Sequence, residues 1–535
     1  MLLRLRLALR RPAFAFWGAR SCSSCSAPRP FPTTLDSTAA AAAPPKPPAD
    51  HRELAQQQNL FTTSLYSPGS PLLLPNGSAI FNKLANFLRA QYPLFGFREV
   101  ITPTIYKKSL WEKSGHWENY ASDMFSVQGR DKSKAEVESM TPEEFGLKPM
   151  NCPGHCLLFA SEKRSYRDLP VRYADFSALH RNEGSGALSG LTRVRRFHQD
   201  DGHIFCRPSQ IQAEIRRTLD FVAMVYGTFG LGPYKLMLST RPEEHYIGTA
   251  EEWARAEGQL KAALDQSGRE WAINEGDGAF YGPKIDIILK DSDGKEHQTA
   301  TIQLDFQLPQ RFELGYTAPA PELEQRGEET TDPALLAHSG LVTPVIIHRA
   351  ILGSLERFLA LLIEHYDGHY PFWLAPRQAI ILSLSDNPTL TQHCHRLAAY
   401  LSGAQPTRDP ETGTLRPAPM GRPAVQVDLD LSPRHLNKKI REAKQKGYNH
   451  ILVVGDKEMN AAAADGGADA WGTANLTFWS QPNMDASRRV LEVARGTLAQ
   501  STEAAGDKTA SSSSSVKANV RDLKRYFEGL LDAYL

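Results

Sequence analysis

Residues 180–206 hold the densest group of side chains that could do chemistry. Two short strand-like runs flank a loop rich in Gly and Ser, which is typical of a hairpin with a long connection. Side chains alternate between strand faces, so Arg181 and Glu183 are predicted to share a face of the first run. The second run places four residues on one face: Phe197, Gln199, Asp201 and His203. The spacing alone fits either a binding surface or a polar face toward solvent.

Length and composition limit the classes of protein that this sequence fits. The 535 residues predict two or three domains. The 61 Lys and Arg nearly balance the 60 Asp and Glu, so any nucleic-acid surface must be a local patch. The six cysteines form no even disulfide framework, which favours a reducing compartment. No apolar run is long enough to span a bilayer, so we expect no membrane association.

The amino-terminal segment reads as a targeting sequence. Its first 35 residues are rich in Arg, Ser, Ala and Leu and lack acidic residues, which is typical of a mitochondrial presequence. A basic tail without targeting function stays open. An Ala/Pro tract follows and predicts a stiff linker. We therefore expect presequence and linker over residues 1–49 and folded chain from residue 50.

The next part of the chain predicts an α+β domain. Apolar periodicity indicates helices over residues 79–91 and 211–229. Strand-like runs occupy residues 97–102, 234–239, 280–289, 298–306 and 344–348. The chain has no Gly-x-x-x-x-Gly-Lys phosphate loop, so ATP would be held another way. The acidic segment 316–340 lacks periodicity and predicts a surface insertion.

The chain from residue 376 changes to strand–helix units, which predict a small α/β domain. A basic helix stands within it, fitting either a solvated face or a phosphate-binding surface; its cations are Arg434, Lys438, Lys439, Arg441, Lys444 and Lys446. Segments 405–422 and 461–470 look like insertions, and 501–515 has low complexity. A last helix is predicted over residues 516–535.

The opening hairpin resembles motif 2 of the class II aminoacyl-tRNA synthetases in its threonyl-tRNA synthetase form. The matching residues are Arg-x-Glu at 181–183, Arg193, and the Gln-Asp-Asp-x-His run that ends at His203. Residues 79–102 resemble motif 1, the dimer-forming helix and strand, and the segment containing Gly353 and Arg357 resembles motif 3. The run Trp-Glu-Lys-Ser-Gly-His-Trp-Glu-Asn-Tyr at 111–120 is similar to a further signature of the same family.

The resemblance implies a fold and an activity. The fold would be a class II antiparallel-sheet catalytic domain over residues 50–375, followed by an α/β anticodon-binding domain over 376–535. The activity would be threonine–tRNA ligation in the mitochondrial matrix by a homodimer, with ATP, threonine and tRNA(Thr) as substrates. Family members often carry an amino-terminal editing domain, and the short segment ahead of residue 50 leads us to expect no editing site in this chain.

The resemblance also implies site residues. Arg181 and Arg357 would be catalytic, and His116 would help transfer threonine to tRNA. The ATP-binding residues would be Arg181, Glu183, Arg193, Phe197, Gln298, Ser354 and Arg357, with Mg²⁺ bridging the phosphates. The threonine-binding residues would be Arg181, Gln199, Asp201 and Tyr281.

Cys152, His203 and His348 match the three positions that bind Zn²⁺ in this family, where the ion sorts threonine from valine. Without the resemblance, a buried cysteine and two hydrogen-bonded histidines would be the simpler interpretation. His155 and His198 are the rival ligands, and His198 lies on the strand face opposite to His203.

Two alternatives stay open. A class II synthetase for another amino acid, such as serine or proline, should lack the zinc triad and Asp201. A catalytically inactive, synthetase-like RNA-binding or regulatory protein should have lost Arg181, Glu183 or Arg357, and all three are present.

Overall fold

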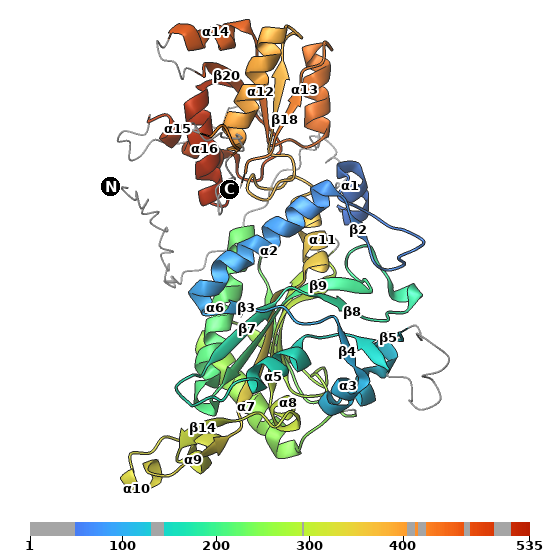
Figure 1. The fold of residues 1–535 in the computed structure, drawn as a ribbon, viewed down its shortest axis with the longest axis vertical. Helices are drawn as coiled ribbons and strands as arrows, with labels where there is room; N and C mark the ends of the chain where they lie inside the picture. The colour runs from blue at the N-terminus through green and yellow to red at the C-terminus, as the bar shows by residue number, and fades with distance from the viewer. Residues whose placement is uncertain are drawn as a thin grey trace, which may run out of the picture. The chain divides into compact units, whose positions relative to one another are not determined.

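The computed structural model describes residues 49–129, 144–244, 246–290, 294–403, 412–415, 424–464, 471–496 and 515–535 (Figure 1). The predicted presequence lies outside the described residues, as does most of the linker and of the segments 405–422, 461–470 and 501–515. Within the described part of the chain, no helix is both long and apolar enough to cross a membrane.

A large sheet organises the first part of the chain. Its described strands run in the order β11 (Trp271–Asn274), β10 (Lys235–Ser239), β12 (Lys284–Lys290), β13 (Glu296–Asp305), β16 (Val345–Ser354), β9 (Arg196–Cys206), β7 (Val171–Asp175) and β3 (Arg98–Glu99), and β8 (Ala178–His180) also pairs with β9. The pairs are antiparallel except for β10 with β11 and β3 with β7. The α+β expectation is confirmed.

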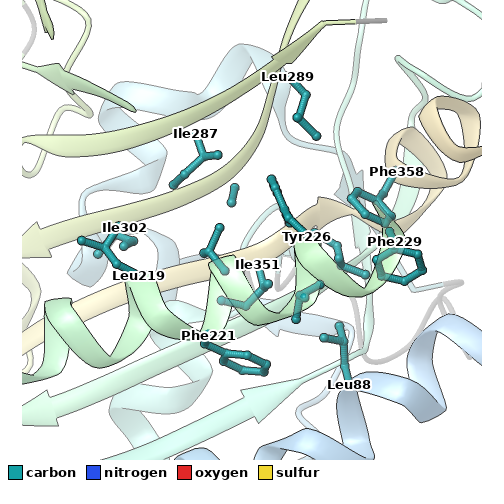
Figure 2. Close-up of a cluster of buried hydrophobic side chains, with 14 of the residues drawn as sticks. Leu88, Leu219, Phe221, Tyr226, Phe229, Ile287, Leu289, Ile302, Ile351 and Phe358 are labelled. Atoms are coloured by element: carbon teal, nitrogen blue, oxygen red, sulfur yellow. The ribbon is translucent and has the colours of Figure 1, made fainter. Parts of the chain in front are cut away.

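Helix α6 (Ile211–Phe229) packs its apolar side against this sheet and has the bounds that periodicity predicts. Figure 2 shows Leu219 and Tyr226 of α6 beside Ile302 and Ile351 of the central strands. The same core receives α2 (Pro75–Phe95) and α11 (Leu355–His365). Burial of these side chains contributes the main stabilising free energy of the unit.

Smaller elements surround the sheet. They are α1 (His51–Gln58), β1 (Phe61–Thr62), β2 (Leu72–Leu73), β4 (Ile105–Lys107), α3 (Lys108–Ser114), α4 (His116–Tyr120), β5 (Ser126–Val127), β6 (Phe145–Leu147), α5 (Cys152–Ala160), α7 (Ala250–Ser267) and α8 (Gln307–Arg311). Pro153 stands in the first turn of α5, where its missing N–H costs nothing.

A second sheet organises the carboxy-terminal part. Its described strands run in the order β18 (Val427–Asp430), β17 (Ala379–Ser383), β19 (His450–Val454), β20 (Thr473–Phe478) and β21 (Ser515–Asn519). The first three are parallel to one another. The helices that belong with this sheet are α12 (Pro388–Ser402), α13 (Leu436–Gln445), α14 (Asp456–Ala464), α15 (Met484–Ala494) and α16 (Val520–Asp532).

The structure differs from the predicted segments in three places. Segment 316–340 contains β14 (Tyr316–Pro319), α9 (Pro321–Arg326), α10 (Pro333–Leu336) and the start of β15 (Ser339–Val342). The last segment begins as strand β21 before α16, because it pairs with β20. The strand predicted over residues 344–348 is longer than expected and includes Arg349, because β16 continues to Ser354 alongside β9.

The predicted basic helix corresponds to α13, which Arg434 precedes and Lys446 follows, and two of its cations are already paired. Lys439 is buried and donates to the Ser383 carbonyl oxygen at 2.9 Å. Arg434 pairs with Asp430 and Glu442, each at 2.7 Å. These two cations already have partners within the domain, so fewer cations of the helix are available to bind phosphate.

Candidate active site

One cavity of about 410 Å³ opens over the middle of the large sheet, on strands β9, β12, β13 and β16. It is lined by thirteen of the fourteen predicted site residues: Cys152, Arg181, Glu183, Arg193, Phe197, Gln199, Asp201, His203, Tyr281, Gln298, His348, Ser354 and Arg357. Segments about 200 residues apart in sequence therefore meet at one place.

The register of the sheet brings the predicted metal ligands together. His203 of β9 lies directly opposite His348 of β16, and Nε2 of His203 lies 2.9 Å from Nδ1 of His348. Cys152 begins α5, and its Sγ and one ring nitrogen of each histidine all lie within 4.8 Å of one another. All three residues are buried. One ion with Zn–N bonds of about 2.0 Å and a Zn–S bond of about 2.3 Å matches such separations.

Each histidine uses its second ring nitrogen elsewhere. Nδ1 of His203 lies 2.7 Å from Nδ1 of His155, and Nε2 of His348 lies 2.9 Å from the Asp305 carboxylate. Partners of this kind fix the ring orientation and tautomer of metal-binding histidines. His155 is thereby an outer partner, and His198 turns away to Glu356 of α11 at 2.9 Å. Neither rival ligand belongs to the convergent group.

Burial sets the electrostatics of this end of the cavity. It raises the pKa of the Cys152 thiol and of the Asp201 carboxyl above their usual ranges. A bound cation would oppose the effect on the thiol by favouring the thiolate. Asp201 lies 4.0 Å from Nε2 of His203, on the same strand face. The set of donors (one sulfur, two imidazoles and a nearby carboxylate) fits zinc.

Arginines gather at the other end of the cavity. The Arg181 guanidinium lies 5.0 Å above the Phe197 ring, and Arg193 pairs with Glu183 at 2.8 Å. Arg181 and Glu183 follow β8, which ends at His180, so the prediction that they share a strand face was wrong. Leaving the strand lets both side chains turn into the cavity.

Helix α11 begins at this end. The Ser354 hydroxyl caps the helix by accepting from the Arg357 N–H at 3.3 Å. Arg357 donates from Nε to the Thr192 carbonyl oxygen at 2.9 Å and from Nη1 to the Gln298 carbonyl oxygen at 3.2 Å. Burial, together with the nearby charges of Arg181 and Arg193, lowers the pKa of Arg357. The cluster of cations suits a polyphosphate ligand.

His116 is the predicted site residue that does not line the cavity. It is fully buried behind it, with Nε2 at 3.8 Å from the Cys152 sulfur and Nδ1 at 2.8 Å from the Ser114 hydroxyl. Burial lowers the pKa of His116 to about 3, helped by the charges of His348 and Arg181.

Sequence reasoning missed three residues here. Gln303 lies opposite His348 on β13 and accepts the Tyr281 hydroxyl hydrogen bond at 2.6 Å. Asp305 holds His348, and Lys284 lines the cavity. A signal existed for two of them, because Thr299, Thr301, Gln303 and Asp305 alternate with Ala300, Ile302 and Leu304. That alternation marks one polar strand face.

Both parts of the chain are similar to known proteins. Residues 136–328 match the family model of the tRNA synthetase class II core domain (G, H, P, S and T), and residues 378–464 match that of an anticodon binding domain. A probable mitochondrial threonine–tRNA ligase of Schizosaccharomyces pombe is 50% identical over 411 residues, which cover 77% of this chain and 82% of that protein. The mitochondrial threonine–tRNA ligase of Saccharomyces cerevisiae is 47% identical, covering 76% and 83%.

A solved structure is also similar. It is described as the RNA binding domain of threonyl-tRNA synthetase from Cryptosporidium parvum Iowa II, with a TM-score of 0.66 and 46% identity. The match covers 80% of this chain and 92% of that chain. The likeness therefore extends through both sheets.

Proposed function

This chain belongs to the threonine–tRNA ligases, and from that premise we propose that a single cavity both activates threonine and selects it. The chain is a class II enzyme that joins threonine to tRNA with ATP, in mitochondrial translation. The observation that carries the residue roles is the meeting of the arginines with Cys152, His203 and His348 around one cavity.

The arginine end would form the adenylate. In this step the threonine carboxylate attacks the α-phosphate of ATP, and an enzyme helps by positioning and by neutralising charge. We assign Arg181 to the carboxylate and α-phosphate, because its planar fork suits both. Arg357 would meet the γ-phosphate. The remaining ATP contacts would come from Glu183 on the adenine amino group, from the Phe197 ring, and from Arg193, Gln298 and Ser354, with Mg²⁺ bridging the phosphates.

The other end would select the amino acid. We assign Zn²⁺ to Cys152, His203 and His348, since three protein ligands leave coordination positions open. When bound, the ion would offer those positions to the amino and hydroxyl groups of threonine, and valine lacks the hydroxyl. Asp201 would accept the hydroxyl hydrogen bond, while Gln199 and Tyr281 would face the amino group. An apolar pocket alone separates such similar shapes only weakly.

Transfer to tRNA would use His116. The resemblance assigns this residue to proton transfer near the terminal ribose; burial, which lowers its pKa to about 3, leaves the ring uncharged but a weak base at neutral pH. The proposal also includes a homodimer. It divides the chain into a presequence, a catalytic domain over residues 50–375 and an anticodon-binding domain over 376–535. The inactive alternative is disfavoured because Arg181, Glu183 and Arg357 all line the cavity.

ATP–pyrophosphate exchange tests the assignment. We expect exchange with threonine, weaker exchange with serine and none with valine, and we expect zinc removal by a chelator to abolish the threonine signal. Cys152→Ala and His203→Ala should lose bound zinc and threonine-dependent exchange together. Metal content and exchange that both persist in these variants would refute the zinc role, and absence of threonine-dependent exchange in the unaltered enzyme would refute the adenylate-forming site.

A further inference from the structure

We propose that His51, outside the cavity, is a positioning residue for ATP binding, because it holds loop 184–195 against helix α11. The buried His51 ring makes two contacts. Its Nδ1 lies 2.7 Å from the Glu364 carboxylate of α11, and its Nε2 accepts the Leu191 N–H at 3.2 Å. The ring is thus a bridge between α1, α11 and the loop. The inference rests on the proposed ATP contacts of Arg193 and Arg357.

One face of α11 holds the loop at two consecutive loop residues, Leu191 and Thr192. Arg357 contacts it directly, through the Thr192 carbonyl oxygen at 2.9 Å. Glu364 acts through His51 on the N–H of Leu191. Arg357 and Glu364 are seven residues apart, so they lie on the same side of the helix. Arg193 comes next in the chain and lines the cavity, so its position depends on both attachments.

Gly190 shows how closely the His51 ring approaches the loop. This glycine has a φ of +46°, and a Cβ atom added there would overlap Nε2 of His51. Any other residue would push the ring away from Leu191 as well as strain the backbone. The Leu191 side chain is fully buried in the main core, which holds the loop from its other side.

A purely structural role for His51 would be to fasten α1, and α1 offers a matched control. Gln58, at the other end of the helix, donates to the Gly368 carbonyl oxygen at 2.8 Å. That contact also fastens α1 to the region after α11, and its partner Gly368 lies outside loop 184–195. Gln58→Ala therefore removes an anchor of α1 while leaving loop 184–195 attached.

The test is steady-state ATP–pyrophosphate exchange on the full chain, with thermal unfolding measured in parallel. His51→Ala should raise the KM for ATP roughly fivefold to tenfold, the loss expected for one hydrogen bond, with the KM for threonine unchanged. His51→Gln should restore much of the ATP affinity, because its amide oxygen can accept the Leu191 N–H. Gly190→Ala should resemble His51→Ala, and Gln58→Ala should leave both KM values unchanged.

Several results would overturn the inference. One is an equal effect of His51→Ala and Gln58→Ala on the KM for ATP. A second is a joint rise of the KM values for ATP and threonine in His51→Ala, and a third is a defect that His51→Gln does not relieve. Failure of the unaltered enzyme to exchange with threonine would refute the proposed function, whereas a normal enzyme with an unaffected His51→Ala variant refutes only the role of His51.

Discussion

At the scale of single residues, the partners of the second ring nitrogens of His203 and His348 decide how firmly the two imidazoles are oriented for a metal ion. Asp305 accepts from Nε2 of His348, and its other oxygen accepts the N–H groups of Gln307 and Leu308. The carboxylate is therefore fixed before any ion binds. A fixed carboxylate leaves Nδ1 of His348 free to face His203.

Asp305→Asn should weaken zinc binding by about 10-fold to 100-fold, the range found for lost outer partners of metal ligands. Competition with a coloured zinc chelator measures this directly. Asp428→Asn is the control, since Asp428 accepts from Tyr448 in the second sheet. Equal zinc affinity in the Asp305 variant and the unaltered protein would contradict the prediction.

Arg349 shows a structural use of charge beside the site. Its guanidinium is buried, lies 4.1 Å above the Phe97 ring and donates to the Asp200 carboxylate at 3.0 Å. Gly202, opposite it on β9, leaves room for this group, because a Cβ there would lie 2.6 Å from the Arg349 Nε.

Gly202→Ala should lower the free energy of unfolding by about 1–3 kcal/mol through overpacking. Urea denaturation measures the change. Gly227→Ala is the matched control on the exposed side of α6, where an added Cβ meets nothing within 4 Å. It should raise stability by up to about 1 kcal/mol through helix propensity. A neutral Gly202→Ala would show that the arginine can move aside.

At the scale of elements, segment 316–342 is ordered by a contact that sequence pattern does not reveal. Glu324 of α9 is buried and pairs with Arg207 at 2.6 Å, while the Tyr316 hydroxyl donates to it at 2.7 Å. Arg207 lies 117 residues earlier, just after β9. From sequence alone, an acidic residue in an aperiodic stretch is predicted to be exposed to solvent, because the pattern does not reveal a distant partner.

The pairing predicts a pH effect. Burial raises the pKa of Glu324, but the Arg207 and Tyr316 hydrogen bonds outweigh it and hold the pKa below its usual range. A depressed carboxyl pKa stabilises the fold above the unfolded value of about 4.3, and this contribution is lost as the pH falls further. The stability difference between unaltered protein and Glu324→Gln, measured by urea denaturation, should therefore shrink between about pH 6 and pH 3. Glu328→Gln, in an exposed pair with Arg326, should show little such change; a constant Glu324 difference would contradict the prediction.

Local pattern predicted elements well where a single face is buried, as the bounds of α6 show. It failed where pairing between distant segments decides, as in β21, which is a strand because β20 lies beside it. The site residues were predicted by resemblance and not by spacing. His203 and His348 are 145 residues apart, and only the register of β9 with β16 makes them neighbours.

At the scale of the whole molecule, exposed apolar side chains indicate where a second copy would bind. Leu94, near the end of α2, is 69% exposed, and Ile101, just after β3, is 87% exposed. Both belong to the segment that resembles motif 1. Water-exposed aliphatic side chains on neighbouring elements are typical of a surface that becomes buried on association.

We therefore expect Ile101→Asp to weaken the proposed homodimer, because a carboxylate would have to lose its water in an apolar interface. Sedimentation velocity over a dilution series should show the variant dissociating at concentrations where the unaltered protein is dimeric. Leu384→Asp is the control, since Leu384 is also exposed (53%) but follows β17 in the second sheet. Equal dissociation of the Ile101 variant and the unaltered protein would place the interface elsewhere, and a monomeric unaltered protein would refute the homodimer itself. Dissociation of the dimer could also lower threonine-dependent exchange, because β3 of motif 1 pairs with β7, and β7 pairs with the cavity strand β9. A lowered exchange rate in the dissociated variant would show that motif 1 helps to hold the cavity in shape.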